Sequence, residues 1–321
     1  MSVNTVINTF ALPFMNVPLT ANAFFVRGER GVMIDAGPKQ TAAENPLLKE
    51  LDALGVNPGD IEQVFFTHWH QDHTGGCEVL LEKGARLYIS EAETEFLQNH
   101  DAAFAAEMLP LSLATGESDE ETAASREELI ATLPSELTAP ELVAPGDNID
   151  LGGASLSVIG LRGHTAGSVG YFLASEGILL AGDGICGSGT RAGCMPLINS
   201  LDQYIATVTG LMSLDIGTVL LSHDFQAPGL TPSRSYSGGP VRMYLSASLE
   251  FAERLRDESA RLAAKRGHPF IDACNEIIAA MPVSYGFLPV EKQASPKLTL
   301  RTLLFALRDF AGWSAACSLN E

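Results

Sequence analysis

The sequence predicts a layered α/β fold that ends in a helical region, and three observations support this. Short apolar runs typical of strands alternate with helical segments up to about residue 235. Gly, Pro and Ser cluster across residues 228–240, which marks a boundary. Beyond it, apolar residues recur three or four positions apart, as on one face of a helix. We therefore expect one domain over 1–235 and a helical C-terminal region over 236–321.

The N-terminal elements are expected to be two strands followed by a helix. Residues 22–35 place apolar runs on either side of a polar turn, which predicts a hairpin that ends at Asp35. A helix is expected over 45–54, closed by Gly55. A short apolar strand over 61–67 follows and leads into a histidine-rich segment.

The middle of the chain adds a helical insertion and a second group of strands. Residues 86–90 read as a strand, and the Ala-, Glu- and Leu-rich residues 91–137 read as the insertion. Strands are expected over 156–161 and 219–221, with a hairpin over 169–181 between them. Helices are predicted over 241–266, 269–281 and 297–312.

Composition narrows the function classes. The chain has 321 residues, 46% of them hydrophobic and 18% charged, which favours a folded protein with a large core. A net charge of −19 makes nucleic acid a poor match as a partner. The sequence shows no apolar run long enough to span a membrane and no secretory signal. An odd count of five cysteines without C-x-x-C spacing suggests reduced thiols and a cytoplasmic location.

The strongest chemical signal is the segment 67–76, which reads Thr-His-Trp-His-Gln-Asp-His-Thr-Gly-Gly. Three of the seven histidines fall within six consecutive residues, which composition alone does not explain. His68 and His70 are two apart, so an extended segment would point both to one side. Asp72 and His73 are adjacent and must point differently. One loop can therefore offer two ligands to one metal ion and two to a neighbouring one.

Three further candidate ligands complete the set, because one loop cannot close two coordination spheres. His164, Asp183 and His223 each follow a predicted strand and lie next to a small residue or a turn. The predicted metal ligands are therefore His68, His70, Asp72, His73, His164, Asp183 and His223.

The order T-H-x-H-x-D-H-x-G-G, G-H-T-x-G-S, G-D and S-H-D resembles the metallo-β-lactamase superfamily over about residues 5–235. The segment 32–37 is similar to that family's strand ending in Asp-x-Gly. The resemblance implies a four-layer αββα sandwich with the site at one edge of the β layers. It implies one metal on His68, His70 and His164, a second on Asp72, His73 and His223, and Asp183 as the bridge between them.

The resemblance also implies a dinuclear, metal-dependent hydrolase. Two cations lower the pKa of a bridging water, and the resulting hydroxide attacks an ester, thioester or lactone carbonyl of a small molecule. Zinc is the default metal, although iron and manganese accept the same ligands. Asp72 is the candidate catalytic residue, since it could also orient the nucleophile or pass a proton. Asp35 is expected to fix the histidine loop through hydrogen bonds.

Details of the motifs favour some branches of the family over others. His70 argues against the flavodiiron branch, which typically has Glu there, and Asp183 rather than Cys argues against the commonest true β-lactamases. The motifs around His164 and Asp183 are similar to the glyoxalase II branch, although its glutathione-binding Lys and Tyr residues are not found. A phosphodiesterase or ribonuclease is the first alternative, disfavoured by the net charge of −19. An iron-dependent, sulfur dioxygenase-like protein is the second.

Substrate contacts are the least constrained part of the prediction. Trp69 either lines the substrate pocket or packs against the insertion. Arg162 and Arg191 lie near the motifs and could each hold a substrate carboxylate, although a surface ion pair is the competing interpretation. The insertion and the helical tail either cover the site or build a homodimer interface.

Overall fold

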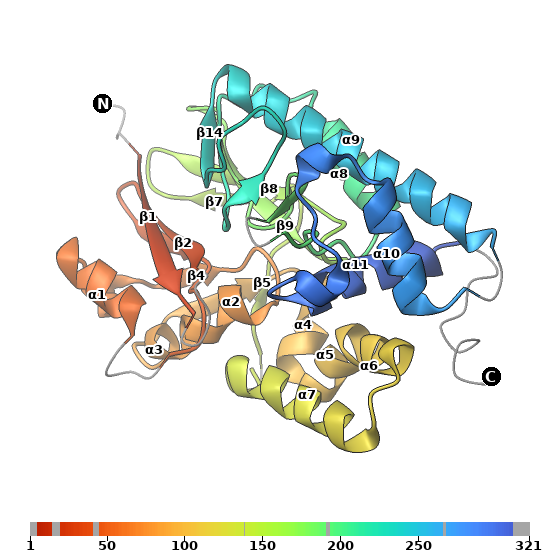
Figure 1. Cartoon of the computed structure of the whole chain (residues 1–321). Coiled ribbons are helices and arrows are strands. Elements are labelled where there is room, and N and C mark those ends of the chain that lie inside the picture. The colour runs from red at the N-terminus through yellow and green to blue at the C-terminus, as the bar shows by residue number, and fades with distance from the viewer. Residues whose placement is uncertain are drawn as a thin grey trace.

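Two six-stranded sheets pack face to face, with helices on the outer face of each (Figure 1). The computed structural model describes residues 5–14, 20–40, 45–137, 139–190, 193–265 and 268–310. This arrangement is the predicted αββα sandwich, with a helical insertion and a helical C-terminal extension.

The first sheet has the strand order β1-β2-β3-β4-β5-β6. The first three strands are antiparallel neighbours, and β3 to β6 pair in parallel. Its strands are β1 (Val6–Pro13), β2 (Thr20–Arg27), β3 (Gly31–Ile34), β4 (Gln63–Phe65), β5 (Arg86–Ile89) and β6 (Glu141–Leu142).

The second sheet has the order β14-β12-β10-β9-β8-β7 and is antiparallel except for the β10–β12 pair. Its strands are β7 (Asn148–Asp150), β8 (Ser155–Gly160), β9 (Val169–Leu173), β10 (Ile178–Leu180), β12 (Thr218–Leu220) and β14 (Ser235–Ser237). A small separate pair joins β11 (Gly189–Thr190) to β13 (Phe225–Gln226).

Alternation along the strands divides the apolar side chains between the layers. In β2, Phe24 enters the cluster between the two sheets, whereas its neighbour Phe25 enters the cluster under the outer helices. In β3, Ile34 and Met33 divide in the same way. Successive side chains of a strand point to opposite faces, so a strand that is apolar throughout must be covered on both sides.

Helices of the first half cover the first sheet and form the insertion. They are α1 (Pro46–Ala53), α2 (Gln71–Thr74), α3 (Glu78–Leu81), α4 (Glu91–Gln98), α5 (His100–Glu107), α6 (Leu109–Thr115) and α7 (Asp119–Thr132), with short 3₁₀ turns at Pro58–Asp60 and Gly75–Cys77. The predicted helix over 45–54 is confirmed as α1, whose first turn is capped by the Asn45 side chain. Residues 91–137 are the predicted helical insertion, α4 to α7.

Helices of the second half cover the second sheet. They are α8 (Leu201–Leu211), α9 (Gly239–Ala263), α10 (Phe270–Ala280) and α11 (Pro296–Arg308), with 3₁₀ turns at Val283–Tyr285 and Val290–Lys292. They share one hydrophobic cluster with residues of that sheet, such as Leu179 and Val219. Helix α11 also touches α6 of the insertion, so the C-terminal region contacts both halves of the molecule. None of the helices in the described part of the chain has the length and hydropathy of a membrane span.

Four strands end at one edge of the sandwich and are followed by the motif loops. In the first sheet, β4 precedes the segment 67–76. In the second sheet, β8, β10 and β12 precede His164, Asp183 and His223 respectively. The fold therefore gathers segments that are far apart in the sequence at a single edge.

Candidate metal centre

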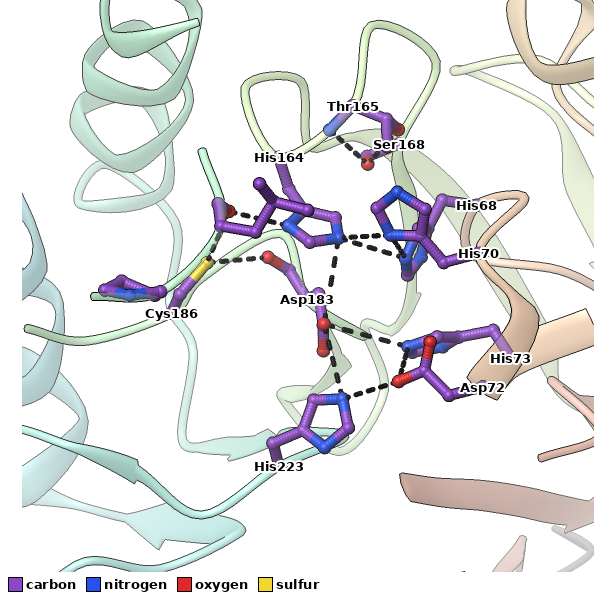
Figure 2. Close-up of polar contacts among 12 residues, drawn as sticks. His68, His70, Asp72, His73, His164, Thr165, Ser168, Asp183, Cys186 and His223 are labelled. Carbon is purple, nitrogen blue, oxygen red and sulfur yellow. Dashed lines mark hydrogen bonds and ion pairs between the residues drawn. The ribbon is translucent and has the colours of Figure 1, made fainter. Parts of the chain in front are cut away.

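The seven predicted ligands lie together at this edge in two adjacent groups (Figure 2). Within each group the potential ligand atoms lie within 4.8 Å of one another. The first group is His68, His70 and His164, and the second is Asp72, His73, Asp183 and His223.

The first group is a compact triangle of imidazole nitrogens. His164 Nε2 lies 3.0 Å from His68 Nε2 and 2.9 Å from His70 Nδ1. His68 Nε2 lies 2.8 Å from the same nitrogen of His70. All three side chains are buried, so their nitrogens face one another rather than water.

The second group combines two carboxylates with two imidazoles. His223 Nε2 lies 3.0 Å from Asp72 Oδ2 and 3.4 Å from Asp183 Oδ2. His73 Nε2 lies 3.6 Å from the first of these oxygens and 3.7 Å from the second. Asp183 Oδ2 is also 3.7 Å from His164 Nε2, so this carboxylate lies between the two groups (Figure 2).

The nitrogen that each histidine turns away from its group has its own partner. His164 Nδ1 donates to the Leu197 carbonyl at 2.7 Å, and His223 Nδ1 donates to the Thr20 carbonyl at 3.0 Å. His68 Nδ1 lies 3.0 Å from Thr67 Oγ1. In the neutral form of each ring, these contacts place the single proton on the outer nitrogen and leave the inner nitrogen with a free lone pair.

Asp35 joins the first sheet to the histidine loop. Its Oδ1 accepts from the Thr67 amide at 2.8 Å, and its Oδ2 accepts from Thr67 Oγ1 at 2.9 Å and from His73 Nδ1 at 2.8 Å. Asp35 is fully buried and has φ 60°, the one positive φ among the described non-glycine residues. A backbone held in this sparsely populated region positions the carboxylate under the loop.

Two buried carboxylates of the insertion were not identified from the sequence. Glu93 of α4 accepts from the Trp69 amide at 3.1 Å and from the Gly167 amide at 2.6 Å, and so links the first and second ligand loops. Glu107, the last residue of α5, lies against His70 Nε2. Glutamates in an Ala- and Glu-rich helix resemble a solvated face, so the sequence carries no signal that sets these two apart.

Electrostatics differ between the two groups. Burial lowers the pKa of all three histidines of the first group, to about 3 for His70 and about 4 for His164. In the second group burial opposes the charged form too, but the carboxylates outweigh it and raise the pKa of His73, and that of His223 to about 10. Without a metal ion, the first group is therefore neutral and the second holds protonated imidazoles between carboxylates.

The donor set fits divalent metal ions. His73 Nε2 and Asp183 Oδ1 are buried and have no hydrogen-bond partner within the described residues, which is costly unless another group satisfies them. Tetrahedral zinc with Zn–N bonds near 2.0–2.1 Å keeps its nitrogens about 3.3 Å apart, so the first triangle would need to open only slightly. Imidazole and carboxylate donors also suit iron and manganese.

The residues predicted to contact the substrate do not gather at the site as the predicted ligands do. Trp69 is 1% exposed and packs against Phe96 of α4 with ring centroids 5.1 Å apart, so its ring lies against the insertion, the second of the two expected positions. The side chain of Arg162 is exposed, and its carbonyl accepts from Thr207. Arg191 lies outside the described residues.

Comparison with known proteins identifies the family. The family profile described as "Metallo-beta-lactamase superfamily" matches residues 16–223. A hydroxyacylglutathione hydrolase from Acidiphilium cryptum (strain JF-5) is 26% identical over 235 residues, or 70% of this chain and 77% of that protein. The probable metallo-hydrolase YqjP from Bacillus subtilis (strain 168) is 43% identical over 56 residues, a match that spans 17% of this chain and 18% of that protein.

Solved structures share the fold over almost the whole chain. A metallo-beta-lactamase family protein from Thermus thermophilus has a TM-score of 0.69 at 19% identity, covering 94% of this chain and 92% of its own. A beta-lactamase domain protein from Burkholderia ambifaria has a TM-score of 0.61 at 18% identity, covering 94% and 85%. The profile match extends over more than half of the sequence, and the fold and the order of the motifs agree with it. The chain therefore belongs to the metallo-β-lactamase superfamily.

Proposed function

We propose that this protein is a dinuclear metal-dependent hydrolase, with zinc as the default metal, acting on an ester, thioester or lactone carbonyl. One observation carries the proposal: seven donor residues form two adjacent groups, with Asp183 between them. His68, His70 and His164 would hold one ion, Asp72, His73 and His223 the other, and Asp183 both. Two such ions would supply the Lewis acidity that activates water and polarises a carbonyl.

Differences in exposure indicate the side from which a substrate reaches the site. The side chains of Asp72 and His223 are 13% and 21% exposed, whereas His68 and His164 are almost completely enclosed. A substrate would therefore approach over the second group. The first group would lie deeper, shielded from bulk water by the protein around it.

Asp72 is the residue best placed to handle a proton. Although burial alone would raise its pKa, His73 and His223 hold the pKa of Asp72 below its usual range, so the carboxylate is ionised at neutral pH. Its Oδ2 points toward the inner nitrogen of His223 on the more exposed side of the site. There it could accept a proton from the attacking water or pass one to the leaving group.

The comparison with curated proteins favours a carbonyl over a phosphodiester substrate. The relative aligned over 70% of this chain is a hydroxyacylglutathione hydrolase, which makes thioesters the first class to test. The net charge of −19 counts against a polyanionic substrate such as RNA.

The proposal is tested by metal content and hydrolysis measured on the same preparation. We expect about two metal ions per chain and a chelator-sensitive hydrolysis within a panel of thioesters, lactones and phosphodiesters. The H164A and H223A variants should each lose metal and activity, whereas R261A, in an exposed ion pair on α9, should match the wild type. Stoichiometric iron near one per chain without hydrolysis, or phosphodiester cleavage alone, would overturn the proposal.

A further inference from the structure

A buried charged network lies behind the first ligand group. The carboxylate of Glu107 lies 2.9 Å from His70 Nε2. It also accepts hydrogen bonds from the side-chain amide of Asn199 at 3.0 Å and from the guanidinium of Arg301. Glu107 and Arg301 are 4% and 9% exposed, although one ends α5 of the insertion and the other belongs to the C-terminal helix α11. An ion pair that is this deeply buried needs good geometry and further hydrogen bonds, because removing both charges from water is costly.

His70 is the member of the first group whose orientation most needs an external partner. His68 and His164 present Nε2 to the group, whereas His70 presents Nδ1. Free imidazole can carry its proton on either nitrogen, so the ring is a metal ligand at Nδ1 only when the proton lies on Nε2. An ionised Glu107 accepts hydrogen bonds but cannot donate one, so it requires a proton on Nε2 and leaves Nδ1 free.

Arg301 holds Glu107 in the position that this role requires. A carboxylate as deeply buried as Glu107 needs a cationic partner and further hydrogen bonds to offset its desolvation. The guanidinium of Arg301 bonds the oxygen Oε2, and Asn199 donates to Oε1, so the carboxylate is fixed from both sides. Arg301 lies well beyond residue 223, where the family match ends, so this contact is built by the C-terminal region of the chain.

We infer that Glu107 and Arg301 are positioning residues, which hold His70 in the Nδ1-ligating tautomer and orientation and so raise the affinity of the first metal site. The inference rests on the proposed metal site and extends it. It assigns to the insertion and the C-terminal helix a shared role in metal binding, beyond covering the sandwich.

The test uses the full chain and zinc itself as the probe. We expect E107Q and R301M each to weaken zinc binding at the first ligand group by about 10- to 100-fold, as is typical when the partner of a metal-binding histidine is lost. Since either single change leaves a buried charge without its partner, the double variant E107L/R301M is included. Replacing both partners of a buried ion pair by apolar residues often preserves folding, and this double variant should fold yet bind zinc as weakly as the single variants.

A second contact between α11 and the insertion region, made by Lys297, provides the control variant. Lys297 of α11 lies 3.0 Å from Ser125 Oγ and 3.8 Å from Glu117 Oε1, both in the insertion region and away from His70. If Arg301 only ties α11 to the insertion, K297M should weaken zinc binding as R301M does. If Arg301 acts through His70, K297M should bind zinc like the wild type.

The second readout is the imidazole ¹⁵N spectrum of the metal-free protein, which reports the tautomer of His70. We expect the Nε2–H form in the wild type and in K297M, and a mixture of the two forms in E107L/R301M. This inference alone would be overturned if the wild type binds zinc and the Glu107 and Arg301 variants keep both its zinc affinity and its His70 tautomer. Failure of the wild type to bind zinc would overturn the proposed function, and the spectrum would still decide whether Glu107 sets the tautomer.

Discussion

The Oδ2 atom of Asp35 lies 2.8 Å from Nδ1 of His73, so a residue at the end of β3 orients a residue of the histidine loop. The same carboxylate accepts two hydrogen bonds from Thr67 at the start of that loop. His73 Nε2, on the other side of the ring, faces the carboxylates of Asp72 and Asp183 and has no hydrogen-bond partner among the described residues. Asp35 therefore fixes both the backbone and the ring of a candidate ligand.

Exchanging the Asp35 carboxylate for an amide should weaken the second metal site. In D35N, asparagine tolerates the positive φ of this position, so the main change is the loss of the charged acceptor beside His73 Nδ1. We expect about 10- to 100-fold weaker metal binding, measured by titration with a competing chelator. D150N makes the same change in an exposed surface ion pair and should leave metal affinity unaltered. Equal affinities in D35N and the wild type would contradict a positioning role for Asp35.

Metal binding at the two groups should respond differently to pH. The raised pKa values of His73 and His223 mean that both are protonated near neutral pH, so an ion entering the second group must displace about two protons. Raising the pH removes these competitors, and affinity there should increase up to about pH 10, the pKa of His223. The histidines of the first group are already neutral, so affinity at that group should change little between about pH 6 and about pH 8.

Calorimetric titrations in buffers of different ionisation enthalpy count these protons directly. We expect little proton release when zinc fills the first group and about two protons when it fills the second. H223N removes one of the two titrating groups and should reduce the number of protons released at the second group by about one. The same proton release at both groups would contradict the separation of charge between them.

Removing the metal should lower the stability of the whole fold. The ligands come from loops of both sheets, and an ion that binds only the native state stabilises it by about 2.7 kcal/mol when its concentration is 100 times its Kd. Chelation should therefore lower the Tm, and added zinc should restore it. The H164A/H223A variant should show the same Tm with and without zinc. A wild-type Tm that does not change although metal content falls would contradict this prediction.

Gly76 should not tolerate a side chain. A Cβ at this position would lie 2.3 Å from the carbonyl oxygen of Ala36, which is backbone and cannot move aside cheaply. G76A should therefore displace the turn after the histidine loop and cost about 1–3 kcal/mol of unfolding free energy in denaturant titrations. In G210A, the same substitution falls on an exposed position of α8 with no atom within 4 Å, and should stabilise by about 0.5–1 kcal/mol. Similar effects of the two substitutions would contradict the steric argument.

Elements with strong local patterns could be predicted from the sequence. The predicted hairpin over 22–35 corresponds to β2 and β3, and the helix predicted over 241–266 corresponds to α9 (Gly239–Ala263), with residue 266 outside the described residues. Alternation and helical spacing are clear in the two segments. Helix α8 was missed, although its buried Leu201, Tyr204, Val208 and Leu211 are spaced three or four apart, because its Thr and Gly residues lower helix propensity.

Only those parts of the site that lie in local sequence motifs could be predicted. The seven ligand candidates lie in distinctive local motifs, and the structure brings them together. Glu93, Glu107 and Arg301 carry no such motif, and their relation to the ligands arises from the packing of α4, α5 and α11 against the loops. Trp69 shows the reverse, because a position between two ligand candidates does not indicate which way a ring points.

The two sheets are each built from one continuous half of the chain, β1 to β6 and then β7 to β14. During synthesis from the N-terminus, the first half emerges with four of the seven ligand residues, and the last donor, His223, follows much later. A nascent chain thus carries four of the donors in one loop before the other three have been synthesised. Neither ligand group can be complete until the second sheet has been made, because His164 belongs to the first group and Asp183 and His223 belong to the second.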